Sequence, residues 1–158
     1  MTDPILFVCL GNICRSPLAE GIFRSLAENA SLSDRFPCDS AGLGGWHAGD
    51  PPDRRSISTA ARHAVDIRGQ RARQLRPDDF ERFSLILAMD TQNLEAIRAR
   101  VPKGSTAQIH SVMAFATGKH VDVPDPYYGT DEDFEGVYTM LFSACQSLLE
   151  KLSAPARS

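Results

Sequence analysis

The sequence predicts an α/β fold built on a parallel sheet, and two features lead to this prediction. Two runs, ILFVC at 5–9 and SLILAM at 84–89, are almost entirely apolar, which is typical of strands buried on both faces. Segments with apolar residues at helical spacing lie between and after these runs. No run approaches the roughly 18 apolar residues of a membrane span. Strands that alternate with helices indicate a parallel sheet with helices on both faces.

The bulk properties are those of one globular domain. The chain has 158 residues, of which 42% are hydrophobic and 23% charged, and its formal net charge is −3. We expect a single domain over residues 1–158 with a frayed tail at 153–158. The absence of a basic excess argues against nucleic acid as the main partner. The N-terminus carries Asp3 and lacks the basic segment of a signal peptide, so we expect a cytoplasmic protein with reduced thiols.

The first half of the chain predicts two strands and two helices. After the first strand, Ser16 is a good N-cap for a helix and Pro17 fits the first helical position. A short second strand is expected at 36–41, and a loop rich in Gly and Pro follows it. The next helix is expected to start at Pro52 or Asp53. Its inner face is expected to hold Ile57, Ala60, Ala61 and Ala64.

The second half predicts two further strands and the longest helix. A helical turn after Pro77 leads into the strand at 84–89. Asp90 is expected to cap the next helix, which does not exclude contact with a functional site. A weak fourth strand is expected at 107–109, and the loop at 122–129 contains two prolines. The last helix has one apolar stripe, formed by Phe134, Val137, Tyr138, Leu141, Cys145, Leu148, Leu149 and Leu152.

The loop after the first strand, VCLGNICRSPLAE at 8–20, is suited to binding a phosphate. It follows the carboxyl end of a strand, where ligands bind in such sheets. Gly11 permits a sharp turn and Asn12 tolerates a left-handed conformation, so successive backbone N–H groups can face an anion. The helix that starts near Ser16 adds its positive end, and the planar guanidinium of Arg15 can hold two phosphate oxygens.

The same loop provides a nucleophile. A helix N-terminus and a cation favour the thiolate form of a cysteine, so Cys9 is expected to attack phosphorus, with Ser16 donating a hydrogen bond to the sulfur. Hydrolysis of the phosphocysteine would complete the reaction. One carboxyl can be the acid in the first step and the base in the second, and Asp125 between two prolines is the candidate. Tyr127 and Tyr128 beside it can wall a cleft for an aromatic substrate.

At these motifs the sequence resembles the low-molecular-weight protein tyrosine phosphatases. VCLGNICRSPLAE lies near the N-terminus and DPYYG near the C-terminus, with DSAGLGGWHAGDPPD, ARQL and LAMD between them. The resemblance covers nearly the whole chain, in order. It implies a single flavodoxin-like domain with a four-stranded parallel sheet, and a phosphocysteine mechanism without a metal or another cofactor.

The resemblance also implies a role for each residue of the site. Cys9 would be the nucleophile, Arg15 the phosphate clamp and Asp125 the general acid and base. The phosphate-binding loop and its support would comprise Leu10, Gly11, Asn12, Ile13, Cys14, Ser16 and Ser40. The substrate cleft would be lined by Leu10, Ile13, Trp46, Tyr127 and Tyr128, and we expect His47 at its rim.

The remaining cysteines, the histidines and a basic run each have a simple interpretation. Cys14 is expected to form a reversible disulfide with Cys9, and the resemblance implies that this bond protects Cys9 from over-oxidation. The alternative is that Cys14 packs under the loop. Cys38 and Cys145 are interpreted as core residues. The four histidines show no metal-ligand spacing, so no metal site is expected. The run 68–76 is interpreted as a solvated face, with docking of an acidic partner as the alternative.

Other activities on a similar scaffold differ in single features of the sequence. Arginine phosphatases of this kind carry threonine where this chain has Ile13, whose apolar wall suits a phenol ring. A thioredoxin-coupled arsenate reductase would need two further cysteines near 80–92, and that segment has none. A binding module without turnover would have lost Cys9 or Asp125. We therefore expect hydrolysis of protein phosphotyrosine and of small aryl phosphates.

The expected partner is a phosphotyrosine protein. Members of the family act on bacterial tyrosine kinases of polysaccharide synthesis, on host proteins or on small aryl phosphates, and these alternatives stay open here. The resemblance implies a monomer or a weak homodimer. It also suggests that Tyr127 or Tyr128 can be phosphorylated.

Overall fold

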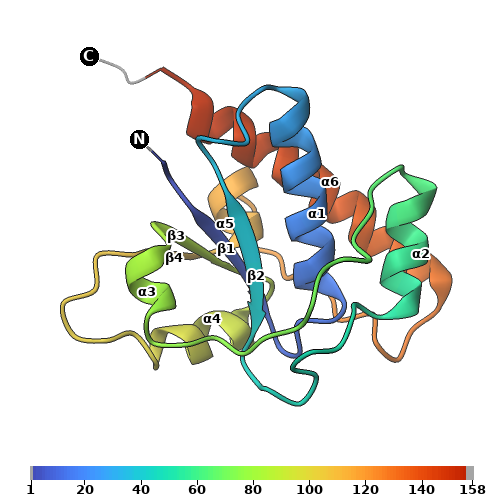
Figure 1. The fold of residues 1–158 in the computed structure, drawn as a ribbon, viewed down its shortest axis with the longest axis horizontal. Helices are drawn as coiled ribbons and strands as arrows, with labels where there is room; N and C mark the ends of the chain where they lie inside the picture. The colour runs from blue at the N-terminus through green and yellow to red at the C-terminus, as the bar shows by residue number, and fades with distance from the viewer. Residues whose placement is uncertain (1, 156–158) are drawn as a thin grey trace.

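The computed structural model describes residues 2–155, which form a four-stranded sheet flanked by helices (Figure 1). Neighbouring strands are parallel, in the order β2-β1-β3-β4. The strands are β1 (Ile5–Cys9), β2 (Cys38–Gly42), β3 (Leu85–Ala88) and β4 (Gln108–Ser111). The predicted α/β fold with a four-stranded parallel sheet is confirmed.

Helices cover both faces of this sheet (Figure 1). They are α1 (Arg15–Asn29), α2 (Arg54–Arg62), α3 (Asp79–Arg82), α4 (Thr91–Arg98), α5 (Val112–Thr117) and α6 (Asp131–Ser153). Because side chains alternate along a strand, β1 supplies Ile5 and Phe7 to the core under α1 and α6, and Leu6 and Val8 to the core on the side of α3 and α4. None of the helices within 2–155 is long and apolar enough to cross a membrane.

The helix ends largely follow their sequence signals. Asp53 caps α2 by accepting from the Arg55 N–H, and Asp90 caps α4 by accepting from the Asn93 N–H. Thr130 starts α6 in a capping box with its third residue. The predicted stripe of α6 is buried except at its last position, where Leu152 is partly exposed.

The start of α1 differs from the prediction. The helix begins at Arg15, and Ser16 lies inside its first turn rather than at the N-cap. The N-cap is Cys14, which makes no side-chain capping bond. The Ser16 hydroxyl instead bonds with Cys9 and Asn12. A tertiary role therefore replaced the local capping role that the residue type suggested.

Other predicted boundaries also need correction. Strand β2 starts at Cys38 rather than at 36, and α5 was not predicted at all. On α2, Ala61 is exposed and Ala64 lies beyond the helix with a φ of 60°, so neither belongs to the inner face. The buried side chains of α2 are Ser56, Thr59 and Ala60.

The structure also corrects two smaller predictions, one for the basic run and one for the C-terminal tail. Within the run 68–76, Arg73 is not simply solvated, because its guanidinium pairs with Asp39 and with the fully buried Asp79. Ser153 is the last residue of α6 and therefore part of a helix. Residues 156–158 of the tail lie outside the described residues, so fraying there stays a prediction.

The strand order determines where a site can form. The chain passes from β1 to the outer strand β2 and then returns to β3 on the other side of β1. In open parallel sheets, the crevice at such a reversal, beyond the carboxyl ends of the strands, is the usual ligand site. Cys9 ends β1, and Asp90 lies two residues after the end of β3. Both therefore face this crevice.

Candidate active site

The loop from β1 to α1 is a tight turn held in an uncommon backbone conformation. It runs from Cys9 to Arg15, and Asn12 has a φ of 59°, in the left-handed region. A Cβ on Gly11 would approach Cδ2 of His47 to 3.2 Å, so glycine lets the imidazole lie close over the loop. The left-handed conformation expected of Asn12 is observed. Gly11 has no positive φ, so its observed role is to leave room for His47.

The Asn12 side chain ties the loop to three parts of the protein. Its Nδ2 donates to Ser16 Oγ at 2.8 Å and to Ser40 Oγ at 3.0 Å. Its Oδ1 accepts from the backbone N–H of Arg73 at 3.0 Å. Since Asn12 is 3% exposed, these bonds replace water and offset the cost of a left-handed residue.

Behind this network lies a buried carboxylate that the sequence analysis did not single out. Ser40 Oγ donates to Glu20 at 2.6 Å, and Arg24 pairs with the other oxygen of the same carboxylate at 2.7 Å. Burial raises the pKa of Glu20, and the bonds from Ser40 and Arg24 oppose this rise. The signal in the sequence was an acidic residue next to an apolar helix face, with an arginine four positions later.

Cys9 and Ser16 are in direct contact. The Cys9 Sγ lies 3.0 Å from Ser16 Oγ, and either atom can be the donor. Both residues are buried. Because Ser16 Oγ also accepts from Asn12 Nδ2, its own proton is free to point at the sulfur.

Arg15 is buried with its guanidinium fixed from two sides. Its Nη1 donates to Asp90 Oδ2 at 2.7 Å and to the carbonyl of Val123 at 2.9 Å, and its Nη2 lies 3.8 Å from Asp125 Oδ2. The sequence suggested Asp90 mainly as a cap, but the structure gives its carboxylate both tasks. This partly explains how a cation that is 2% exposed is tolerated.

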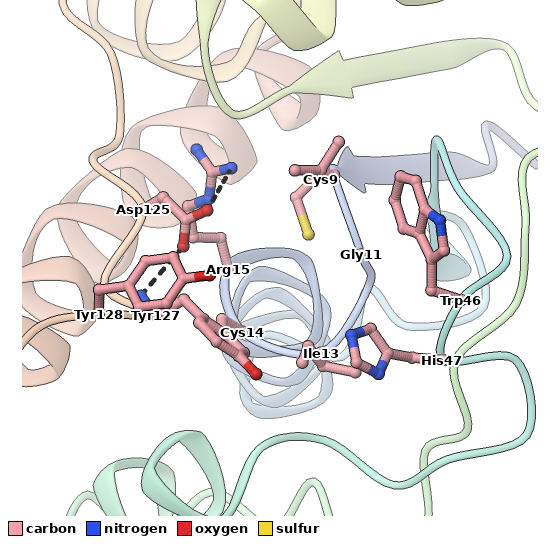
Figure 2. Close-up of a pocket in the computed structure, with 11 residues that line it drawn as sticks. Cys9, Gly11, Ile13, Cys14, Arg15, Trp46, His47, Asp125, Tyr127 and Tyr128 are labelled. Carbon is pink, nitrogen blue, oxygen red and sulfur yellow. Dashed lines mark hydrogen bonds and ion pairs between the residues drawn. The ribbon is translucent and has the colours of Figure 1, made fainter.

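Asp125 lies opposite the loop on the segment that follows α5. Its side chain is 45% exposed, and its Oδ1 accepts from the backbone N–H of Tyr127 at 3.1 Å. Figure 2 shows Asp125 beside the Arg15 guanidinium, and Cys9 Sγ pointing into the same space. A carboxyl near a thiol and a guanidinium is suited to exchanging protons with a bound ligand.

These groups line one cavity of about 250 Å³. Trp46 and His47 lie on one side of it, and Tyr127 and Tyr128 on the other (Figure 2). Its lining comprises Cys9, Leu10, Gly11, Ile13, Cys14, Arg15, Trp46, His47, Asp125, Tyr127 and Tyr128. The predicted residues that do not line it, Asn12, Ser16 and Ser40, support the loop from behind.

Trp46 is unusually exposed for a tryptophan, at 71%. Its six-membered ring lies against Gly44, where any Cβ would collide with it. The indole therefore presents a flat apolar face at the rim of the cavity rather than filling the core. Tyr128, at 98% exposed, does the same on the opposite rim.

The other cysteines are thiols in shielded positions. Burial, with the nearby carboxylate of Asp53, raises the pKa of Cys14 to about 12. Burial also raises the pKa of Cys38 to about 12, and Cys145 is fully buried. Cys9 and Cys14 are both free thiols on the cavity wall. Among residues 2–155, no group of three or more His, Cys, Asp or Glu side chains is arranged to hold a metal ion.

Comparisons with known proteins agree on one family. Residues 4–157 match the sequence model described as "Low molecular weight phosphotyrosine protein phosphatase". The human protein of that name is 41% identical over 152 residues, which cover 95% of this chain and 96% of the human one. A crystal structure of a protein tyrosine phosphatase from Entamoeba histolytica is 36% identical with a TM-score of 0.90, covering 96% of this chain and 97% of the other. A crystal structure of a Drosophila arginine phosphatase is 30% identical with a TM-score of 0.87, covering 96% and 99%.

The fold and the site define an α/β phosphatase in which a cysteine and an arginine share the loop after the first strand. The extent of the sequence match narrows this class further. The chain belongs to the low molecular weight phosphotyrosine protein phosphatase family. The resemblance drawn from the sequence motifs is thereby confirmed.

Proposed function

We propose that this protein hydrolyses phosphotyrosine in proteins, and small aryl phosphates, through a phosphocysteine intermediate. One observation carries the proposal: Cys9 and Arg15 line a single cavity together with Asp125, which lies in a distant part of the sequence. Cys9 ends β1, Arg15 is the first residue of α1, and Asp125 lies in the segment before α6. The family assignment supports the same activity.

In the first step, the phosphate is held by backbone N–H groups of residues 10–15 and by the guanidinium of Arg15. Cys9 Sγ attacks phosphorus as a thiolate, so an S–P bond forms while the bond from phosphorus to the phenolic oxygen breaks. Asp125 gives its proton to that oxygen. The donors that bind the substrate also match the charge on the transferring phosphoryl group.

In the second step, the phosphocysteine is hydrolysed. Asp125, now a carboxylate, takes a proton from water, which attacks phosphorus as the S–P bond breaks. Ser16 donates its hydroxyl proton in a hydrogen bond to the departing sulfur, consistent with the 3.0 Å separation between them. Inorganic phosphate leaves and Cys9 is restored.

The walls of the cavity favour an aromatic leaving group. Ile13 and Leu10 offer apolar surface beside the loop, and Trp46, Tyr127 and Tyr128 offer flat rings around it, with His47 at the rim. Such walls stabilise a phenyl ring by apolar contact and ring–ring packing. The similarity to an arginine phosphatase structure makes phosphoarginine the substrate against which this proposal is measured.

The proposal treats residues 1–158 as one catalytic domain, because both hydrophobic clusters share the same sheet. It assigns a phosphotyrosine protein as partner, acted on in the cytoplasm by a monomer or weak homodimer. A bacterial tyrosine kinase of polysaccharide synthesis is the partner class to assay first. No metal or other cofactor takes part in either step.

The test compares a phosphotyrosine peptide with a phosphoarginine peptide, with reductant and a metal chelator present. The wild type should release phosphate from phosphotyrosine, and Cys9→Ser should lower this rate by on the order of 10³-fold or more. Cys38→Ser, a change away from the cavity, serves as the matched control. Faster release from phosphoarginine would overturn the substrate assignment, and activity retained in Cys9→Ser would overturn the mechanism.

A further inference from the structure

We propose that Arg55 is a positioning residue that holds the Asp125 segment over the phosphate-binding loop, and this inference rests on the function proposed above. Arg55 lies on the first turn of α2 and does not line the cavity. It acts on the reaction through the backbone of the segment that carries the acid. Neither the motifs nor the resemblance assigned it a role.

Arg55 reaches the far end of the Asp125 segment. Its Nη2 donates to the carbonyl of Tyr127 at 2.9 Å, and its Nη1 lies 3.4 Å from the carbonyl of Gly129. These carbonyls lie two and four residues after Asp125. A planar guanidinium can bond two carbonyls at once with a defined geometry.

The guanidinium is itself fixed in place. Asp53 accepts from its Nε and Nη2 at 3.0 Å each, which is a bidentate pair. The Arg55 guanidinium carbon also lies 4.5 Å from the centre of the Phe134 ring and 5.7 Å from that of Tyr127. Held between a carboxylate and two rings, the side chain loses little further freedom on bonding the segment.

The other end of this connection is the phosphate-binding loop. The backbone N–H of Asp53 donates to the carbonyl of Ile13 at 2.8 Å, and Ser56 Oγ donates to the carbonyl of Cys14 at 3.3 Å. The N-terminus of α2 is thus bonded to the loop that carries Cys9. Through Arg55, the same helix end is bonded to the segment that carries Asp125.

The Asp125 segment needs such a connection at its far end. Its near end is fixed at Val123, whose N–H donates to the carbonyl of Met89 and whose carbonyl accepts from Arg15. Asp125 itself is 45% exposed and bonds to the N–H of Tyr127 within its own segment. Because that N–H and the carbonyl bonded by Arg55 flank the same residue, moving Tyr127 moves the carboxyl.

The consequence is specific to proton transfer. A displaced acid slows cleavage most when the leaving oxygen is a strong base, because such an oxygen needs the proton. If Asp125 is displaced, the Arg15 guanidinium keeps its bonds to Asp90 and to the Val123 carbonyl, so phosphate binding should change less than proton transfer. A loss of Arg55 should therefore resemble a weakened Asp125 rather than a weakened loop.

The experiment measures kcat/KM of Arg55→Met on phenyl phosphate, a poor leaving group, and on p-nitrophenyl phosphate, a good one. We expect a loss on the order of tenfold for phenyl phosphate and a clearly smaller loss for p-nitrophenyl phosphate. Arg54→Met, at the exposed neighbouring position, is the matched control and should leave both values unchanged. Equal slowing of both substrates would overturn the proposal, because it would indicate a general structural effect.

A double-mutant cycle gives the second readout. If Arg55 acts through Asp125, adding Arg55→Met to Asp125→Asn should lower kcat/KM for phenyl phosphate only slightly below that of Asp125→Asn alone. A loss that multiplies with that of Asp125→Asn would overturn the proposal. If Arg55→Met does not fold, the same measurements are made on Arg55→Lys. Lysine keeps the positive charge but lacks the planar guanidinium that bonds two carbonyls.

The two proposals fail in different ways. If Cys9→Ser remains active, or if Asp125→Asn slows both aryl phosphates equally, the proposed function is at fault. If both variants behave as expected and Arg55→Met shows no dependence on the leaving group, only the role of Arg55 is wrong. The same set of proteins therefore separates the outcomes.

Discussion

Arg15 and Asp90 form a close ion pair in which one carboxylate does two tasks. Oδ2 of Asp90 accepts from Arg15 Nη1 at 2.7 Å, while Oδ1 accepts from the backbone N–H of Asn93 at 2.7 Å. The residue that starts α4 thus also orients the guanidinium beside Cys9. Replacements that keep one task and remove the other can separate the two contributions.

Asp90→Ser and Asp90→Ala form such a pair. Both remove the carboxylate that pairs with Arg15 Nη1, so kcat/KM for an aryl phosphate should fall by on the order of tenfold in each. Only alanine also removes the cap, so its unfolding free energy should be lower than that of the serine variant by about 1 kcal/mol. Aryl phosphate kinetics and urea unfolding measure the two effects. Full activity in Asp90→Ser would show that Arg15 is oriented without the carboxylate.

The left-handed residue of the loop predicts an order of stability. Asn12→Gly and Asn12→Ala both lose the three side-chain hydrogen bonds of Asn12. Alanine must in addition adopt a φ near 59°, which glycine does freely. We expect Asn12→Ala to be the less stable by about 1 kcal/mol in urea unfolding. The reverse order would mean that the loop rearranges when the asparagine is absent.

Trp46 is the single tryptophan of the chain, so its fluorescence reports on the rim of the cavity. In Gly44→Ala, the new Cβ would collide with the indole, which must then move. We expect a shifted emission maximum and a raised KM for aryl phosphates, with the affinity for inorganic phosphate nearly unchanged. Gly69→Ala, where a Cβ would meet open space, is the control. An unchanged spectrum in Gly44→Ala would contradict the observed position of Trp46.

The shielding of Cys14 predicts a pH dependence for the formation of the disulfide with Cys9 that the sequence analysis expects. After one equivalent of peroxide converts Cys9 to a sulfenic acid, attack by Cys14 Sγ forms the disulfide and releases water. The attacking species is the thiolate, and burial raises the pKa of Cys14 to about 12. Below that pH the thiolate fraction rises tenfold per pH unit, so the rate should rise about tenfold between pH 7 and 8. Mass spectrometry of quenched samples measures it.

The control for this reaction is Cys14→Ser, in which Cys9 should proceed to the sulfinic acid and lose activity permanently. In the wild type, reductant should restore activity. A disulfide that forms equally fast at pH 6 and pH 8 would indicate that Cys14 is not the shielded thiol described above.

The parts of the fold that were predictable are those with local causes. The continuous apolar runs identified β1 and β3, and the apolar stripe identified α6, because burial on both faces or on one helix face leaves a repeat in the sequence. Asp90 was predicted as a helix cap, and Pro52 or Asp53 as a helix start, because these signals depend on the residue type and its immediate neighbours. The short α5 was missed because six residues are too few to show a period.

The parts that were not predictable depend on distant partners. Ser16 has the chemistry of a cap, yet its hydroxyl serves Cys9 and Asn12. Arg73 sits in a basic run, yet it pairs with Asp79, a residue with no exposed surface. In each case the residue type was informative, but its partner became known only from the tertiary structure.

The bonds of Arg15 span long distances in the chain. Its guanidinium contacts Asp90, 75 residues away, and the carbonyl of Val123, 108 residues away. Contacts of such separation form late in folding, because a long loop must close before they contribute. Return of phosphatase activity during refolding should therefore lag behind the helical signal of α1 and α6. Catalytic activity in this protein therefore reports that the whole chain has assembled. A chain with its helices formed, but with the Val123 segment not yet bonded to Arg15, would be inactive.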